Sequence, residues 1–149
     1  MSGTSAITIN RILVATDFSE HAELALNWAQ TLATPFAAKL ILLHVVDIYS
    51  LAQTSCRMVG SDFLSIVRDA AQEGMQKVQA RFPDAEIVIR EGSPRPMIVD
   101  AASEFDCQMI VMGTHGRSGL AHLLLGSVAE YVVRHSPIPV LTVHAPSAS

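Results

Sequence analysis

Glycines and hydroxyl side chains are concentrated in one short stretch of the sequence. Residues 113–119 read GTHGRSG, and Gly126 is followed directly by Ser127. Glycine tolerates positive φ and lets backbone N–H groups approach a ligand closely, and such groups bind phosphate. Ser127 could donate a further hydrogen bond, and Arg117 or His115 could neutralise phosphate charge. The pattern predicts an anion-binding loop, although a simple turn would explain Gly113 alone equally well.

A second polar segment lies near the start of the chain. Residues 15–19 read ATDFS and follow an apolar run, so Ala15, Thr16 and Asp17 would line the end of a strand. This segment has a carboxylate and hydroxyls but no glycine. The chain therefore has no GxGxxG sequence after its first strand, and Gly126-Ser127 lacks the spacing and the Lys of a Walker A loop. Neither a Rossmann dinucleotide site nor a P-loop is expected.

Alternating apolar runs and amphipathic stretches should position these segments. Continuous apolar runs typical of strands buried on both faces occur at 11–15, 39–46, 86–90, 108–112 and 139–143. Apolar residues at helical spacing occur at 22–33, 63–78, 97–105 and 125–133. The resulting order, βαβαβαβαβ, predicts one α/β domain over residues 1–149 with a doubly wound, five-stranded parallel sheet and four helices.

Local signals refine this outline. Asp17 or Ser19 could cap the first helix, and Ser93 followed by Pro94 should open the third helix with a hydroxyl cap. The run at 86–90 is short and flanked by charge, so it is expected at an edge of the sheet. Residues 47–61 have no clear period and are expected to form a loop over one end of the sheet.

The positions of the two polar segments select a strand order. Ligands of open α/β sheets bind beyond the carboxyl ends of the strands, where the strand order reverses. The polar segments follow the first and fourth strands, which favours order 3-2-1-4-5 over the flavodoxin-like order 2-1-3-4-5. The helix that begins near 126–128 would then point its free N–H groups and its positive dipole end at the same place.

The spacing Gly113-x-x-Gly116-x9-Gly126-Ser127 resembles the G-2x-G-9x-G-[S/T] signature of ATP-binding universal stress proteins. The resemblance covers almost the whole chain, from RILVATDFSEHAELAL, through LHVVD at 43–47, to GSVAEYVVRHSPIPVLTV. It implies an adenine-nucleotide alpha-hydrolase-like fold, ATP as ligand and Mg²⁺ or Mn²⁺ bound with the nucleotide. One departure is visible, because ATP-binding members often carry Pro where this chain has Ala15.

The resemblance also implies roles for matching positions. Asp17 would contact the ribose or the associated metal, and the backbone of Val45 would bind adenine. Met112 and Gly113 would line the adenine and ribose side. The phosphates would be held by four residues: Gly116, Gly126, Ser127 and Val128.

The last predicted strand would form the other edge of the sheet. Pro137 and Pro139 stand at its start, where an edge strand tolerates proline. The residues from Val140 to Val143 would leave an apolar edge that pairing with a second copy of the chain would cover. The resemblance implies the same homodimer.

Composition limits the function classes. The 149 residues carry a net charge of −4 without a basic run, so no nucleic-acid partner is expected. No apolar run is long enough to span a bilayer. The N-terminus does not look like a signal peptide, and two cysteines without a CxxC pair suit a reducing cytoplasm. The first hypothesis is an ATP-binding stress or signalling protein without catalysis. The alternatives are an enzyme, either a slow ATP hydrolase or an adenylyl transferase, and a nucleotide-independent dimeric interaction module.

Six histidines raise the question of a metal site. No pair has the HExxH arrangement of a zinc helix. His44 and His144 are expected to be satisfied within or near strands, and His21 is expected to face solvent. His115 lies inside the glycine loop, where contact with phosphate or solvent is favoured over catalysis. No metal-ligating residues are predicted from these positions.

Overall fold

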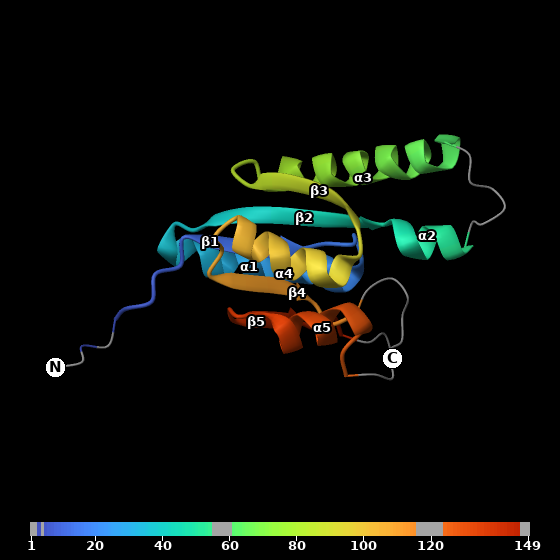
Figure 1. Cartoon of the computed structure of the whole chain (residues 1–149). Helices are drawn as coiled ribbons and strands as arrows, with labels where there is room; N and C mark the ends of the chain where they lie inside the picture. Colours follow the sequence, from blue (N-terminus) through green and yellow to red (C-terminus); the bar gives the residue numbers. More distant parts are fainter. Residues whose placement is uncertain (1–2, 4, 55–60, 116–123, 147–149) are drawn as a thin grey trace.

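The computed structural model describes residues 3, 5–54, 61–115 and 124–146. Its centre is a parallel five-stranded sheet of order β3-β2-β1-β4-β5 (Figure 1). The strands are β1 (Arg11–Ala15), β2 (Lys39–Asp47), β3 (Glu86–Gly92), β4 (Met109–Gly113) and β5 (Val140–Val143). The predicted strand order and both predicted edge strands are therefore confirmed, and β1 lies between β2 and β4 at the point where the order reverses.

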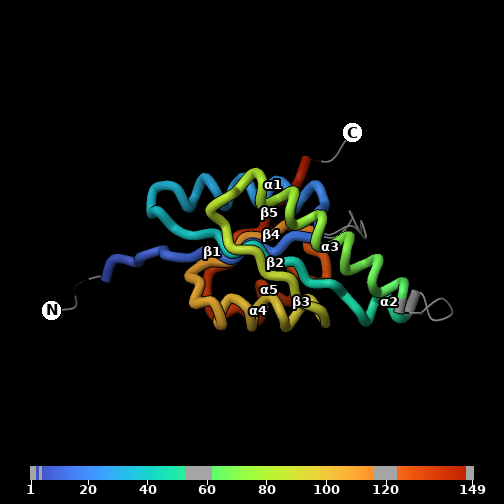
Figure 2. Tube along the Cα trace, turned by 90° about the horizontal axis from the view of Figure 1, so that it is seen from above, coloured from blue at the N-terminus to red at the C-terminus, as the bar shows by residue number. Residues whose placement is uncertain are grey.

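The helices form two layers, one on each face of the sheet (Figure 2). On one face lie α1 (Glu20–Ala33) and α3 (Ser61–Arg81), and on the other α4 (Pro94–Glu104) and α5 (Ser127–His135). A short 3₁₀ turn, η1 (Thr34–Phe36), follows α1. Within the described ranges no helix is both long and apolar enough to cross a membrane.

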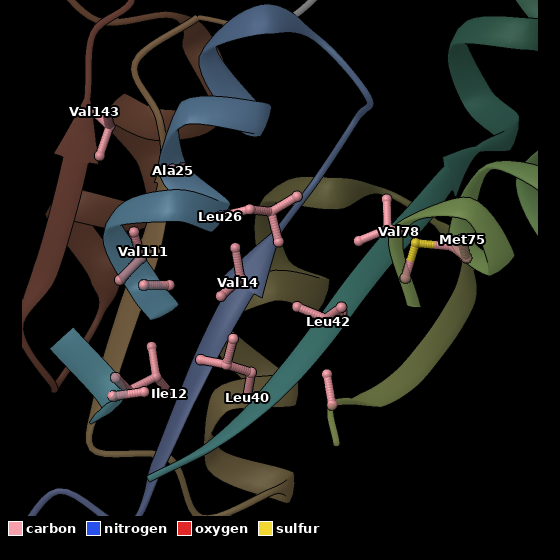
Figure 3. Close-up of a cluster of buried hydrophobic side chains, with 13 residues drawn as sticks. Ile12, Val14, Ala25, Leu26, Leu40, Leu42, Met75, Val78, Val111 and Val143 are labelled. Carbon is pink, nitrogen blue, oxygen red and sulfur yellow. The ribbon is translucent and has the colours of Figure 1, made fainter. Parts of the chain in front are cut away.

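Successive apolar side chains of the strands pack on opposite faces of the sheet, and helices cover both faces. Ile12 and Val14 of β1 pack with α1 and α3 in one buried cluster, whereas Leu13 belongs to the cluster on the opposite face. Figure 3 shows the first cluster, in which Leu26 of α1 and Met75 of α3 lie over the sheet. Because successive side chains of a strand point to opposite faces, a continuous apolar run is what a doubly covered strand requires.

One predicted loop is wrong. Residues 47–61 were expected to be irregular, but Asp47 ends β2 and a fifth helix, α2 (Ile48–Thr54), follows it directly. The Asp47 carboxylate accepts hydrogen bonds from the backbone N–H of Ser50 at 3.0 Å and from its hydroxyl at 2.8 Å. This is N-terminal capping by a residue that also belongs to the strand. Residues 55–60 lie outside the described part of the chain.

The predicted side-chain caps of α1 and α4 have different outcomes. Ser19 caps α1, because its Oγ accepts the backbone N–H of Ala22 at 3.2 Å. Ser93 is the N-cap residue of α4, and Pro94 is in the first turn as predicted, but no hydrogen bond runs from the Ser93 side chain into the helix. The predicted hydroxyl cap at Ser93 is therefore wrong.

Candidate functional site

A cavity of about 1170 Å³ lies beyond the carboxyl ends of β1, β2 and β4. It is lined by every predicted site residue that the structure describes: Ala15, Thr16, Asp17, Val45, Met112, Gly113, His115, Gly126, Ser127 and Val128. Gly116 and Arg117, the remaining two, fall in the range 116–123, outside the described residues. The fold thus brings residues from distant parts of the chain to one place at the switch point of the sheet.

The N-terminus of α5 opens onto this cavity. Gly126 is the N-cap residue, and the next three residues, Ser127, Val128 and Ala129, all line the cavity. The first N–H groups of a helix have no partner inside the helix, and here no side chain of the N-cap residue accepts one. The Gly126 N–H is held by the Thr114 carbonyl at 2.7 Å, which ties the helix start to the end of β4. Backbone donors and the helix dipole therefore make this end suited to an anion.

The loop after β1 is held in a fixed shape by short-range hydrogen bonds. Asp17 Oδ1 accepts the Ser19 N–H at 3.0 Å, and Thr16 Oγ1 accepts the Phe18 N–H at 3.1 Å. Phe18 has a positive φ of 66°, and its ring lies 4.5 Å from the His44 ring, measured between centroids. The loop thereby holds the Asp17 carboxylate at the cavity wall.

Strand β2 extends beyond the end of its neighbour β1. The β1–β2 pairing ends at Ala15 and Leu43, whereas β2 continues to Asp47 beside β3. The Leu43 carbonyl accepts the Thr16 N–H at 2.9 Å, so it points toward β1. Backbone polar groups two residues apart in a strand point the same way, so the N–H and C=O of Val45 point past the end of β1, into the cavity.

Close packing of neighbouring elements also requires glycine at 113 and restricts the space at Gly126. Neither has a positive φ, which among the described glycines occurs at Gly92. A Cβ on Gly113 would lie 2.6 Å from the Cβ of His21 and 3.2 Å from the backbone nitrogen of Ala22. A Cβ on Gly126 would lie 3.2 Å from the Thr114 carbonyl oxygen. Glycine at 113 therefore allows α1 to pack directly against the end of β4, and neither position uses the positive φ that glycine tolerates.

Helix α3 supplies another wall of the same cavity. Its apolar part is formed by Val67, Ala70, Ala71 and Gly74, and the charged residues Glu73, Lys77 and Arg81 also line the cavity. Gly74 lies directly against the ring of Phe18, so a Cβ at this position would lie 2.7 Å from Phe18 Cζ. Ligand cavities typically combine apolar walls with a few directed polar groups. This cavity has that character, with amide donors at α5 and an apolar surface at α3.

Three histidines meet beside the cavity, and the sequence did not predict this. His21 from the start of α1, His115 after β4 and His144 after β5 have ring centroids 5.2 to 5.7 Å apart. His21, expected to face solvent, is half-buried, and its Nδ1 accepts the Ala145 N–H at 2.9 Å. The available signal was that all three residues closely follow the ends of strands that are neighbours in the predicted order.

Comparison with known proteins assigns the chain to a family. Residues 8–144 match the universal stress protein family. Universal stress protein MJ0577 of Methanocaldococcus jannaschii is 31% identical, with 93% of this chain and 96% of that protein covered. A putative universal stress protein of Staphylococcus haemolyticus, SH1215, is 34% identical, with 92% and 86% covered.

Solved structures agree with the sequence relatives. The structure of hypothetical protein MJ0577 superposes with a TM-score of 0.85 at 32% identity, covering 95% of this chain and 100% of that one. A universal stress protein crystallised in complex with cAMP superposes with a TM-score of 0.60 at 28% identity, covering 93% and 98%. The family match, the relatives and the shared fold lead to one conclusion: this chain belongs to the universal stress protein family.

Proposed function

We propose that the chain binds ATP in the cavity at the switch point, with the phosphates at the N-terminus of α5. The observation that carries the proposal is the start of this helix, where Ser127 and Val128 offer backbone donors to the cavity and the N-cap residue supplies no competing acceptor side chain. Such a helix start attracts phosphate through both its N–H groups and its dipole. The expected roles of Gly116 and Arg117 remain predictions.

The adenine base would lie at the β2 side of the cavity. The backbone of Val45 presents a donor and an acceptor beyond the end of β1, which matches the donor and acceptor edge of adenine. The apolar wall from α3 supplies a surface for a flat ring. The structural relative bound to cAMP, an adenine nucleotide, supports the choice of base.

A divalent ion, Mg²⁺ or Mn²⁺, is proposed to bind together with the nucleotide. Magnesium in nucleotide sites is usually held by one or two carboxylates and by the phosphates themselves. Asp17 fits this role, because its carboxylate lines the cavity and is oriented by the Ser19 N–H. The ion would neutralise phosphate charge, and Asp17 would bind the ion or the ribose.

The proposed function is binding without rapid catalysis. The N-terminus of α5 supplies donors, which hold a phosphate but do not remove a proton from an attacking water. Slow ATP hydrolysis is the second candidate, and His115 favours it, because this histidine lines the same cavity. A nucleotide-independent interaction module is the third candidate. The proposed location is the cytoplasm, because cysteines without a CxxC pair suit a reducing compartment.

The test is a calorimetric titration of nucleotide-stripped protein with Mg-ATP, Mg-ADP, AMP and adenosine, followed by a phosphate-release assay. We expect saturable binding of ATP, weaker binding of adenosine, and release far slower than the turnover of typical enzymes, about 10 s⁻¹. Phosphate release above the background rate that is lost in His115→Ala would establish the slow hydrolase instead. Failure of every adenine nucleotide to bind would leave the interaction module.

A homodimer through β5 is proposed as the assembly. The strand is an edge of the sheet, and its residues Leu141 and Val143 form a shallow hollow with Trp28 of α1, which is 50% exposed. Pairing of two β5 strands across a twofold axis would satisfy the outer backbone groups and cover this apolar surface.

A further inference from the structure

The three histidines beside the cavity have the composition and spacing of a metal site. One nitrogen of each imidazole of His21, His115 and His144 lies within 4.8 Å of the corresponding nitrogens of the other two. Imidazole nitrogen is a preferred ligand of zinc and related transition metals, and three histidines with one open position form a common zinc arrangement. We propose that His21, His115 and His144 bind a divalent transition-metal ion of the zinc type.

The side chain that orients two of the rings is already in place. Thr114 Oγ1 lies 3.0 Å from His144 Nδ1 and 3.1 Å from His115 Nδ1, and Thr114 is 6% exposed. A hydroxyl oxygen can accept two N–H groups through its two lone pairs. With Nδ1 protonated on both rings, each Nε2 carries the lone pair that a metal needs. Hydrogen bonds of this kind fix the tautomer and the orientation of metal-ligating histidines.

Thr114 is itself held by the backbone. Its N–H donates to the Val143 carbonyl at 2.9 Å, and its carbonyl accepts the Gly126 N–H at 2.7 Å. The hydroxyl between the two rings is therefore fixed to β5 on one side and to the start of α5 on the other. Zinc–nitrogen distances are about 2.0–2.1 Å, so the three nitrogens, which lie within 4.8 Å of one another, must move closer together when the ion binds.

His21 can act as the third ligand only if it gives up an existing hydrogen bond. A neutral imidazole has one lone pair on nitrogen, and in His21 that lone pair accepts the Ala145 N–H at 2.9 Å. A metal must take this lone pair whichever nitrogen of His21 it binds, so binding breaks the contact with Ala145. Burial and the neighbouring rings of His144 and His115 lower the pKa of His21, which favours the neutral, ligating form near neutral pH.

Access and coordination number fit an ion that exchanges with solvent. His115 is buried, His21 is half-buried and His144 is exposed, so in the single chain the site opens at His144. In the described part of the chain no fourth His, Cys or carboxylate completes the group. A fourth position is thus left for water or an anion. His21 and His144 are absent from the lining of the nucleotide cavity, so this proposal does not rest on ATP binding.

The first experiment titrates untagged, nucleotide-free protein with Zn²⁺ against a chromophoric chelator. We expect one ion per chain, and affinity at least about tenfold weaker in His21→Ala and His144→Ala. His135→Ala is the matched control, because His135 is exposed on α5 and contacts Tyr131. His21→Gln and His144→Gln repeat the test should an alanine variant unfold. No binding by the wild type, or equal binding by the His144 variants, would overturn the proposal.

Two further readouts separate ligation from a structural effect. Thr114→Val should weaken Zn²⁺ binding by about 10- to 100-fold, whereas Thr114→Ser should retain it, because only the hydroxyl orients the rings. In the wild type, Zn²⁺ should shift the amide NMR signal of Ala145, whose hydrogen bond to His21 is lost. An unchanged Ala145 signal in the zinc-loaded protein would show that His21 is not a ligand and would contradict the proposed site.

Discussion

His21 makes a pH-dependent contribution to stability. Its pKa is lowered from 6.5 by burial, then by His144 and His115, and Glu20 and Asp17 oppose the shift. A lowered pKa means that the unfolded chain binds the proton more readily than the folded chain. The free energy of unfolding should therefore fall as the pH drops through and below the unfolded pKa, about 6.5.

Urea denaturation at about pH 7.5 and about pH 5.5 measures this effect. His21→Gln should show a smaller loss of stability between the two values than the wild type does, because glutamine takes up no proton. His135→Gln, at an exposed histidine on α5, is the control and should behave as the wild type. A larger loss in the His21 variant would contradict the assigned direction of the shift.

Gly113 and Gly126 should differ in their tolerance of a side chain. Gly113→Ala places a Cβ against the backbone and Cβ of α1, which cannot move without shifting the helix, so a loss of about 1–3 kcal/mol is expected. Gly126→Ala meets the Thr114 carbonyl oxygen at 3.2 Å and should lose less. Chemical denaturation of both variants gives the comparison. Equal losses would show that the packing of α1 on β4 does not select glycine at 113.

At the scale of residues, the sequence predicted which residues lie together in the cavity better than it predicted how they pack. The glycine spacing and the polar segment after β1 identified residues that meet in one cavity. The sequence could not show that Gly113 is opposed by His21, because this contact depends on how closely α1 packs on the sheet. The histidine group was missed for the same reason, since its members come from three separate elements.

Among the elements, α1 depends on a side-chain cap and α4 does not. Ser19→Ala removes the acceptor for the Ala22 N–H and should lower the free energy of unfolding by about 1 kcal/mol. Ser93→Ala is the matched control, because the Ser93 side chain makes no capping hydrogen bond. Thermal and urea denaturation of the two variants test the difference. A loss at Ser93 as large as that at Ser19 would contradict the assignment of the caps.

The elements with a clear hydrophobic pattern could be predicted from the sequence, whereas the short helix α2 could not. The strands and the four longer helices follow from apolar runs and helical spacing, because a doubly covered sheet imposes both patterns. Helix α2 spans seven residues, too few for a period to be recognised, and it begins directly after β2. The signal that could have found it is Asp47, three residues before Ser50, in the position of a helix cap.

For the whole molecule, the β5 edge allows a direct test of the proposed dimer. The carbonyls of Pro139 and Val143 accept N–H groups from the β4 side, so the backbone of Thr142 points to the open edge. Thr142→Pro removes an outward N–H without breaking the β4 pairing, and proline is tolerated on an edge strand. Light scattering should show a dimer for the wild type and a monomer for this variant. A wild-type monomer, or a dimeric variant that is folded, would contradict pairing through β5.

The strand order could be predicted because chemistry, and not periodicity, selected it. Apolar runs alone fit several doubly wound orders, whereas polar segments after the first and fourth strands fit a switch point between them. The observed order has β1 between β2 and β4. The cavity itself depends on the overhang of β2 and on the position of α3, which no local pattern specifies.

The central claim is that the N-terminus of α5 holds the phosphates of ATP. Ser127→Pro tests it directly, because proline at the first helical position preserves the helix while removing one N–H and the hydroxyl. Gly126 already has the extended conformation, with φ −69° and ψ 167°, that a residue before proline adopts. Ser127→Ala, which removes only the hydroxyl, is the intermediate control.

Calorimetric titration of the wild type and Ser127→Pro with Mg-ATP and with adenosine is therefore the decisive measurement. The proposed site predicts that the variant binds ATP at least about tenfold more weakly, a loss of about 1.4 kcal/mol, while its affinity for adenosine is unchanged. Equal binding of ATP by a folded Ser127→Pro variant would contradict the placement of the phosphates at α5.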